Sequence, residues 1–106
     1  MSFLTDLERR IILTLKGRIS KALAFNSSSS LKDEEKIGLE AIFQEIDDIL
    51  LYKGLSFKNV KENFQNRLKE TASALKKSRK AYLRSHIIPL MNKIGTGNWD
   101  GDNLDD

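Results

Sequence analysis

Residues 57–94 carry the most informative pattern for predicting the fold, and they read FKNVKENFQNRLKETASALKKSRKAYLRSHIIPLMNKI. Apolar residues recur here at intervals of three and four, the spacing that places side chains on one face of a helix. The stripe is interrupted by the polar run KKSRK and then resumes. One straight helix over 56–94 would be ~58 Å long at about 1.5 Å per residue. We therefore predict a break near 73–80 and a kink at Pro89, which has no backbone N–H to donate.

Two further amphipathic segments precede this stretch. Over 4–23, apolar residues again repeat at intervals of three and four. Thr5 and Glu8 have the spacing of a reciprocal capping box, so a helix is expected to begin near Thr5. Over 39–50, a wide apolar face is backed by a mostly acidic one. Each segment is therefore predicted to be a helix with one buried face.

The connections between the predicted helices have their own sequence patterns. The polar run 26–30 contains four serines and no apolar residue, so we expect a mobile connection in which Ser30 caps the second helix. Lys53 followed by Gly54 is typical of a helix C-terminus. The third helix is then expected to begin at once, with a hydrophobic staple around its N-cap formed by Leu55, Ser56 and Val60.

These patterns predict an all-α protein. We expect one domain over residues 1–95, an antiparallel four-helix bundle in which a continuous third and fourth helix is the open alternative. Residues 96–106 contain four Asp and one Trp and are expected to form a flexible, disordered acidic tail. No segment alternates with a period of two, so a β-sheet is not expected.

The amino-acid composition argues against several kinds of site. The 106 residues include no Cys and one His, so we expect neither a disulfide framework nor a thiolate or multi-histidine metal site. No cofactor is predicted. No apolar run approaches the ~20 residues that a membrane span requires. We expect a cytoplasmic protein, with peripheral contact to a membrane surface left open.

The net charge of +3 hides a strong segregation, because residues 56–94 carry +8 while 31–53 and 95–106 carry −4 each. Several bases of the third segment are expected on one broad helical face that binds phosphate groups of RNA or lipid. A solvated face, or one that packs on the acidic second helix, is the alternative. The bases of this predicted phosphate-binding face are Lys69, Lys76, Lys77, Lys80 and Arg84.

Two smaller patterns also point to candidate sites. Trp99 beside Asp100 in the acidic tail is typical of a short docking motif, although it is equally compatible with a simple chain terminus. Arg79 and His86 have a spacing similar to that of small helical HEPN-type ribonucleases, in which His acts as acid or base. A partly buried histidine at the edge of the core is the alternative for His86, and no enzyme activity is predicted.

Residues 45–61, EIDDILLYKGLSFKNVK, carry a family resemblance. The stretch is similar to the N domain of the signal-recognition-particle GTPases, the family of the particle's GTPase subunit and its receptor. In that family, two adjacent aliphatic residues end the second helix, an aliphatic residue closes the turn and a Val follows in the third helix. These positions are occupied by Leu50, Leu51, Leu55 and Val60, and the similarity extends over residues 4–95.

The resemblance implies a role in co-translational protein targeting. Leu50, Leu51 and Leu55 would lie against a GTPase domain, and the module would also contact the partner GTPase and the ribosome. The sequence departs from the family at Tyr52, Lys53 and Gly54, and it contains no phosphate-binding glycine loop. An excised N domain, a stand-alone relative and an unrelated bundle therefore remain as alternatives.

Three hypotheses for function follow. The first is a non-enzymatic helical module for protein interaction, like the N domain of the targeting GTPases. The second is a basic helical protein associated with RNA or the ribosome, and the third is a small helical ribonuclease.

Overall fold

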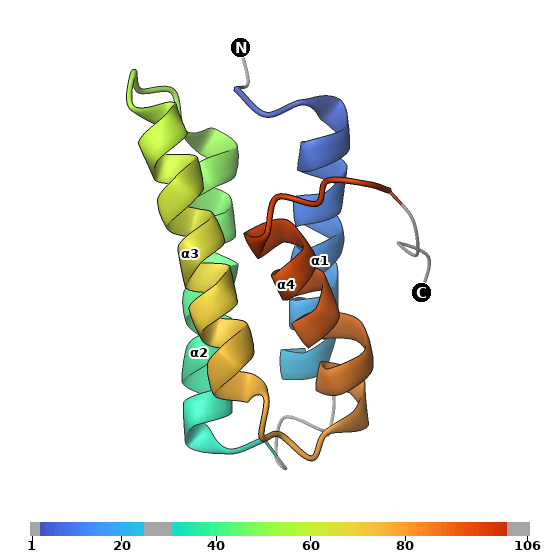
Figure 1. Ribbon diagram of the computed structural model, residues 1–106. Helices are drawn as coiled ribbons and strands as arrows, with labels where there is room; N and C mark the ends of the chain where they lie inside the picture. The colour runs from blue at the N-terminus through green and yellow to red at the C-terminus, as the bar shows by residue number, and fades with distance from the viewer. Residues whose placement is uncertain (1–2, 25–30, 102–106) are drawn as a thin grey trace.

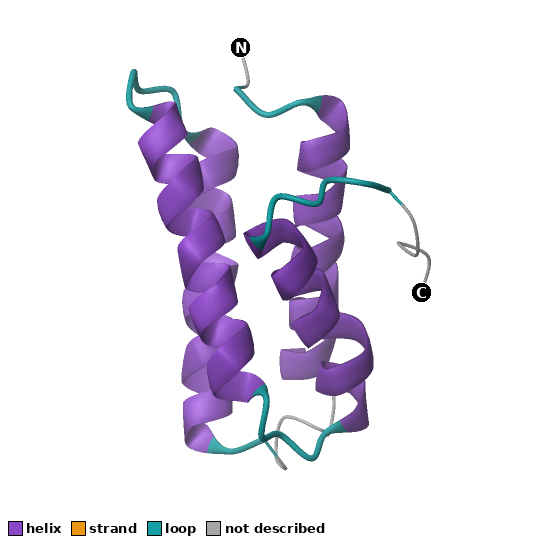
Figure 2. Ribbon diagram, in the orientation of Figure 1, coloured by secondary structure: helices purple, strands orange, loops and turns teal. Residues whose placement is uncertain are grey.

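The computed structural model describes residues 3–24 and 31–101, and every regular element in these two ranges is a helix. The predicted all-α class is therefore confirmed (Figure 2). The predicted break lies at residues 76–80, which separate α3 from the next helical segment. The elements in chain order are α1 (Asp6–Ala24), α2 (Asp33–Leu51), α3 (Phe57–Leu75), the π-helical turn η2 (Leu83–Ile87) and α4 (Ile88–Gly95).

The helices lie along the long axis of a molecule that measures 40 × 26 × 22 Å. Figure 1 shows α3 in front of α2 and α4 in front of α1, with each successive helix returning toward the end from which the previous one came. The connection between α2 and α3 lies at one end, near the beginning of α1, and residues 76–80 lie at the opposite end. The two connections thus define two distinct ends of the bundle.

The core is built from the apolar stripes predicted by periodicity. One departure concerns α1, where Ile12 is fully buried whereas Leu7 is 40% exposed. Ile12 is enclosed because α1 packs against α2 on one side and against η2 and α4 on another. The fully buried side chains are Ile11, Ile12, Leu15, Ile19, Leu39, Ile42, Ile46, Leu68, Leu83, Ile87, Met91 and Ile94.

A complete capping box begins α1, as the sequence predicts. The Glu8 amide donates to Thr5 Oγ1 at 3.1 Å, and the Thr5 amide donates to Glu8 Oε1 at 3.0 Å. For α2 the sequence predicts Ser30 as the N-cap, but the N-cap residue is Lys32. Ser30 itself lies outside the described residues. The Lys32 amide donates to Glu35 Oε1 at 2.9 Å, but lysine has no acceptor to return the bond. Only half of a capping box is therefore formed there.

The connection between α2 and α3 departs from prediction in two respects. Helix α2 ends at Leu51 rather than at the Lys53–Gly54 pair. The predicted staple is also absent, because Leu55 is fully exposed and does not pack on Val60. Ser56 is the N-cap residue of α3, although its side chain makes no capping hydrogen bond.

The expected kink near Pro89 takes the form of a π-helical turn. The Ile88 amide bonds back to the Leu83 carbonyl, five residues earlier, instead of four. The wider turn makes room for a residue that has no N–H to donate. Arg18 of α1, which is 5% exposed, donates from Nη1 to the His86 carbonyl in this turn at 2.9 Å. The buried guanidinium of Arg18 therefore donates a hydrogen bond to a backbone carbonyl in a turn whose helical hydrogen bonding is irregular.

Candidate interaction surfaces

One end of the bundle presents a group of apolar side chains, which we call the apolar end. Its centre is a ring cluster in which Phe57 is stacked on Phe3, with centroids 5.3 Å apart, and tilted against Tyr52 at 6.2 Å. Beside these rings, Leu51 is 73% exposed and Leu55 is fully exposed. The apolar end consists of Phe3, Leu51, Tyr52, Leu55 and Phe57.

The loop that carries Leu55 is held in place by the Tyr52 side chain. The Tyr52 ring packs over Gly54 so closely that a Cβ at Gly54 would clash with the ring. Tyr52 also contacts Phe57, so the loop is held between the two helices that it joins. With Tyr52 turned onto the molecule, Leu55 is left facing solvent.

The three residues of the predicted partner interface fall into two groups. Leu51 and Leu55 are exposed, whereas Leu50 is partly buried and packs against the core. Two exposed lysines, Lys53 and Lys58, lie beside these residues, whereas Lys61 pairs with Glu8 and the exposed Asp48 lines the adjoining hollow. The apolar end is therefore flanked by positive charge.

A hollow of about 200 Å³ lies between α2 and α3 and extends the apolar end toward the middle of the bundle. Ile49, Val60 and Phe64 form part of its lining, and an ion pair between Arg67 and Glu45 contributes the polar part. The second Glu45 oxygen, Oε2, is buried and accepts no hydrogen bond within the described part of the chain. The hollow thus offers apolar contact beside an ion pair.

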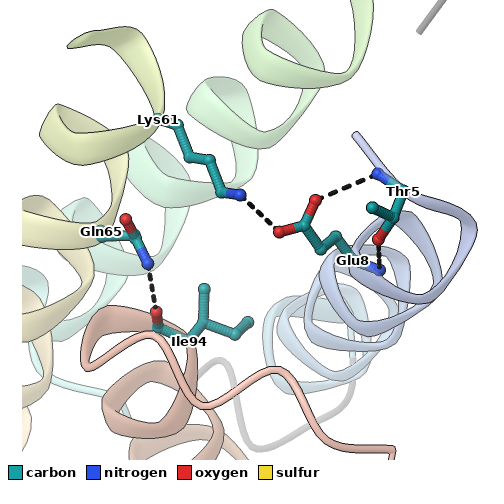
Figure 3. A network of polar contacts seen from close by, with 5 residues as sticks. All are labelled: Thr5, Glu8, Lys61, Gln65 and Ile94. Carbon is teal, nitrogen blue, oxygen red and sulfur yellow. Dashed lines mark hydrogen bonds and ion pairs between the residues drawn. The ribbon is translucent and has the colours of Figure 1, made fainter. Parts of the chain in front are cut away.

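A polar network joins three segments just inside this end of the molecule (Figure 3). Glu8, which closes the cap of α1, also pairs with the Lys61 ammonium of α3. Burial raises the pKa of Glu8, but the hydrogen bonds from Lys61 and Thr5 together bring it below its ordinary value. The neighbouring Gln65 donates from Nε2 to the Ile94 carbonyl at 3.0 Å and so satisfies the end of α4.

Trp99 and Asp100 occupy a different environment from the one predicted. Trp99 is half-buried against the core, with the Lys61 ammonium 5.0 Å from its ring centroid, and Asp100 pairs with Lys93. Residues 96–101 thus fold back on the bundle, and residues 102–106 of the predicted tail lie outside the described ranges. Trp99 and Asp100 contact their own domain because Lys61 lies over the Trp99 ring and Lys93 pairs with Asp100. The sequence pattern does not reveal that these two lysines are close by.

The opposite end carries a basic connection between α3 and η2, which we call the basic turn, residues 76–80. Lys76, Lys77 and Arg79 are exposed, whereas Ser78 between them is only 6% exposed. The Ser78 amide donates to the Leu75 carbonyl at 2.9 Å, and Ser78 Oγ accepts from the Lys80 amide at 3.1 Å. A buried serine therefore holds the turn with its cations outward.

Ser78 also connects the basic turn to α2. Its hydroxyl bonds to the Glu35 carboxylate. Burial raises the pKa of Glu35, but bonds from the Lys32 amide and from Ser78, with the nearby Lys32 and Lys80 charges, bring it below its ordinary value. The one buried acid at this end is thus matched by two cations.

The single basic helical face predicted for the third segment is not formed. Helix α3 ends at Leu75, so Lys69 belongs to α3, Lys76 and Lys77 to the turn, and Arg84 to η2. The break divides the predicted face because the chain reverses direction between its members. Arg67 pairs with an acid of α2, but the bases Lys69, Lys76, Lys77, Arg79 and Arg84 form no ion pair within residues 3–24 and 31–101.

His86 lies at the edge of the core, as one of the two alternatives predicted. Its ring is half-buried and stacked on Tyr82, with centroids 4.6 Å apart, and Nδ1 is 2.7 Å from Ser85 Oγ. No hydrogen bond joins it to Arg79, which projects from the basic turn. Within the described residues, the ring of His86 thus contacts Tyr82 and Ser85.

The described residues contain neither a cluster of metal ligands nor a membrane-spanning helix. No three His, Asp or Glu side chains in these ranges are grouped as metal ligands. Likewise, none of the described helices combines the length and apolar character needed to cross a membrane.

No family model matches this chain, and no curated protein or solved structure does so. The candidate surfaces therefore rest on their own geometry and chemistry.

Proposed function

We propose that this protein is an antiparallel four-helix bundle that acts as a non-enzymatic interaction module and binds a partner protein through its apolar end. The observation that carries the proposal is the exposure of Leu51, the last residue of α2, and of Leu55, which lies on a loop that Tyr52 and Gly54 hold in place. Fully burying one leucine side chain contributes about 1.5–3 kcal/mol. A loop that is already ordered loses less conformational freedom on binding.

The surroundings of the loop indicate the chemistry of the partner. Its surface should present an apolar patch opposite Leu51 and Leu55 and acidic side chains opposite Lys53 and Lys58. The hollow beside Val60 would accept one apolar side chain of the partner. Such a mixed surface is typical of a protein domain, because exposed aromatic and aliphatic anchors occur at the centres of protein interfaces.

The finer form of the proposal is that the partner is the GTPase domain of a targeting GTPase in the cytoplasm. It is supported by the similarity of residues 45–61 to that family and by the exposure of two of the three expected contact residues, Leu51 and Leu55. In this form the chain contributes a regulatory module and the GTPase domain supplies nucleotide binding.

The proposal that a protein partner binds the apolar end is tested by site-specific cross-linking. A photoreactive amino acid replaces Leu55, and a matched variant carries it at Ile37, an aliphatic residue on α2 that is 68% exposed. In cells that produce the protein, position 55 should give one dominant covalent adduct that position 37 does not give. Equal adducts at both positions would contradict a specific apolar end.

The finer proposal is tested by titration calorimetry with purified GTPase domains of the particle subunit and of its receptor. One of them should bind, and Leu51→Gln with Leu55→Gln should weaken binding at least about 10-fold. Ile37→Gln should leave it unchanged. Absence of binding to either domain would reject the targeting role, and GTP binding by this chain alone would contradict a purely regulatory module.

A further inference from the structure

We infer that the basic turn is a second binding surface, which holds the phosphate backbone of a nucleic acid. The inference is independent of the proposed partner at the apolar end, because the two surfaces lie at opposite ends of the molecule (Figure 1).

The turn presents its cations in a defined arrangement. Ser78 is buried and bonded on both sides, to Glu35 and to the Lys80 amide at 3.1 Å. Its neighbours on either side, Lys77 and Arg79, are exposed, and so is Lys76. Three side chains with strong donors for phosphate oxygens therefore project from a short, anchored segment.

These cations are available to an external anion. Lys76, Lys77, Arg79 and Arg84 form no ion pair within residues 3–24 and 31–101. The buried carboxylate at this end, Glu35, already lies beside Lys32 and Lys80. The exposed Glu34 and Glu70 line a hollow beside Leu75, but the turn itself contains four bases and no acid, so a phosphate bound to it would meet positive charge.

The surroundings favour a nucleic acid over a membrane. Anionic lipids hold a peripheral protein best when apolar side chains insert beside the bases, and none of the large exposed hydrophobic residues in the described ranges lies in the basic turn. Ser78 of the turn bonds to Glu35 of α2, and the exposed hydrophobic residue nearest to Glu35 in the sequence is Ile37. Because Ile37 is two positions from Glu35, it lies on the opposite side of that helix. The turn also has no aromatic side chain for base stacking, so we expect contacts to phosphates without sequence preference.

The affinity of the basic turn for a nucleic acid should then depend strongly on the salt concentration. Neutralising about four phosphates should make the affinity fall about 100-fold between 50 and 200 mM salt. The apolar end would stay free, because the bundle is 40 Å long and its two ends are separate. The molecule is thereby arranged to link a protein partner to a nucleic acid.

The test is fluorescence anisotropy on the full chain with a 20-nucleotide RNA hairpin, a DNA duplex of the same sequence, and vesicles containing phosphatidylserine. The variant Lys76→Gln with Lys77→Gln is compared with Lys53→Gln with Lys58→Gln, which removes the same charge from exposed lysines at the other end. We expect the first pair to weaken nucleic-acid binding at least about 10-fold and to reduce the salt slope by about 2. The second pair should change affinity less than about 2-fold.

Four results would overturn the inference. Equal losses in the two double variants would show an effect of net charge alone, and no measurable binding at 50 mM salt would exclude the surface altogether. Binding that withstands salt would exclude phosphate contacts as its basis. Vesicle binding that depends on Lys76 and Lys77, without binding to either nucleic acid, would assign the turn to lipid instead. Circular dichroism of each variant confirms that the exposed substitutions leave the helices intact.

Discussion

Glu8 and Lys61 form an ion pair that joins the first turn of α1 to the first half of α3. The same carboxylate also accepts the Thr5 amide at 3.0 Å, so one side chain caps a helix and connects it to another. Lys61 in turn lies 5.0 Å from the Trp99 ring centroid. The pair thus ties together the beginning of the chain, its third helix and residues near its C-terminus.

Replacing Lys61 by Met should destabilise the fold by about 1–3 kcal/mol, because Glu8 would remain buried without its charged partner. The two side chains are 24% and 11% exposed, so solvent screens the interaction only in part. Urea unfolding followed by circular dichroism gives the change in the free energy of unfolding. The exposed Lys58→Met serves as control and should change it by less than about 0.5 kcal/mol. Similar losses in both variants would show that the pair with Glu8 is not what matters.

Stability should depend on pH through two buried acids. Glu8 and Glu35 both have a pKa below the ordinary value. Each therefore binds fewer protons in the folded state than in the unfolded state at mildly acidic pH. Their contribution is fully present above the unfolded pKa of about 4.3 and is lost as pH falls through the lower folded pKa.

Thermal unfolding measured from pH 7 to pH 3 checks this dependence. The wild-type melting temperature should fall steeply below about pH 4.5, and Glu8→Gln with Glu35→Gln should flatten the fall. Glu40→Gln, an exposed site on α2, is the control. A double variant with the same acid-side slope as the wild type would refute the assignment to these carboxylates.

Two glycines should respond oppositely to alanine. Nothing lies within 4 Å of the position that a Gly17 side chain would occupy, so Gly17→Ala should stabilise the middle of α1 by about 1 kcal/mol. At Gly95, the added carbon would meet the Gln65 carbonyl oxygen at 3.1 Å and would clash with the Lys69 stem. We expect Gly95→Ala to cost about 1–3 kcal/mol. Calorimetric melting curves of the two variants should shift in opposite directions.

Arg18 should stabilise the irregular turn before Pro89. Because Arg18→Met leaves the His86 carbonyl without its donor, the variant should lose about 1–3 kcal/mol and show faster amide hydrogen exchange in η2 than elsewhere. Arg10→Met replaces an exposed arginine of the same helix and is the control. Unchanged exchange in η2 would mean that the π-helical turn does not depend on Arg18.

Local patterns predicted the helices well and the connections less well. The capping box at Thr5 and Glu8 involves residues three apart, so spacing alone located it. The staple around Leu55 was wrong because Tyr52 packs on Gly54 and Phe57 instead, a competition among side chains that no periodicity expresses. The single basic face was wrong in its arrangement, since its bases lie on both sides of the break.

Residue spacing alone was enough to predict the all-helical class, the break in the third segment and the apolar faces that form the core. These features follow from side-chain spacing within one or two helical turns. Three other features become apparent only in the three-dimensional arrangement: Leu51 and Leu55 face solvent, Trp99 packs near Lys61, and the cations beside the buried Ser78 are exposed. These outcomes depend on contacts between residues far apart in the chain, where packing and charge pairing outweigh local preference.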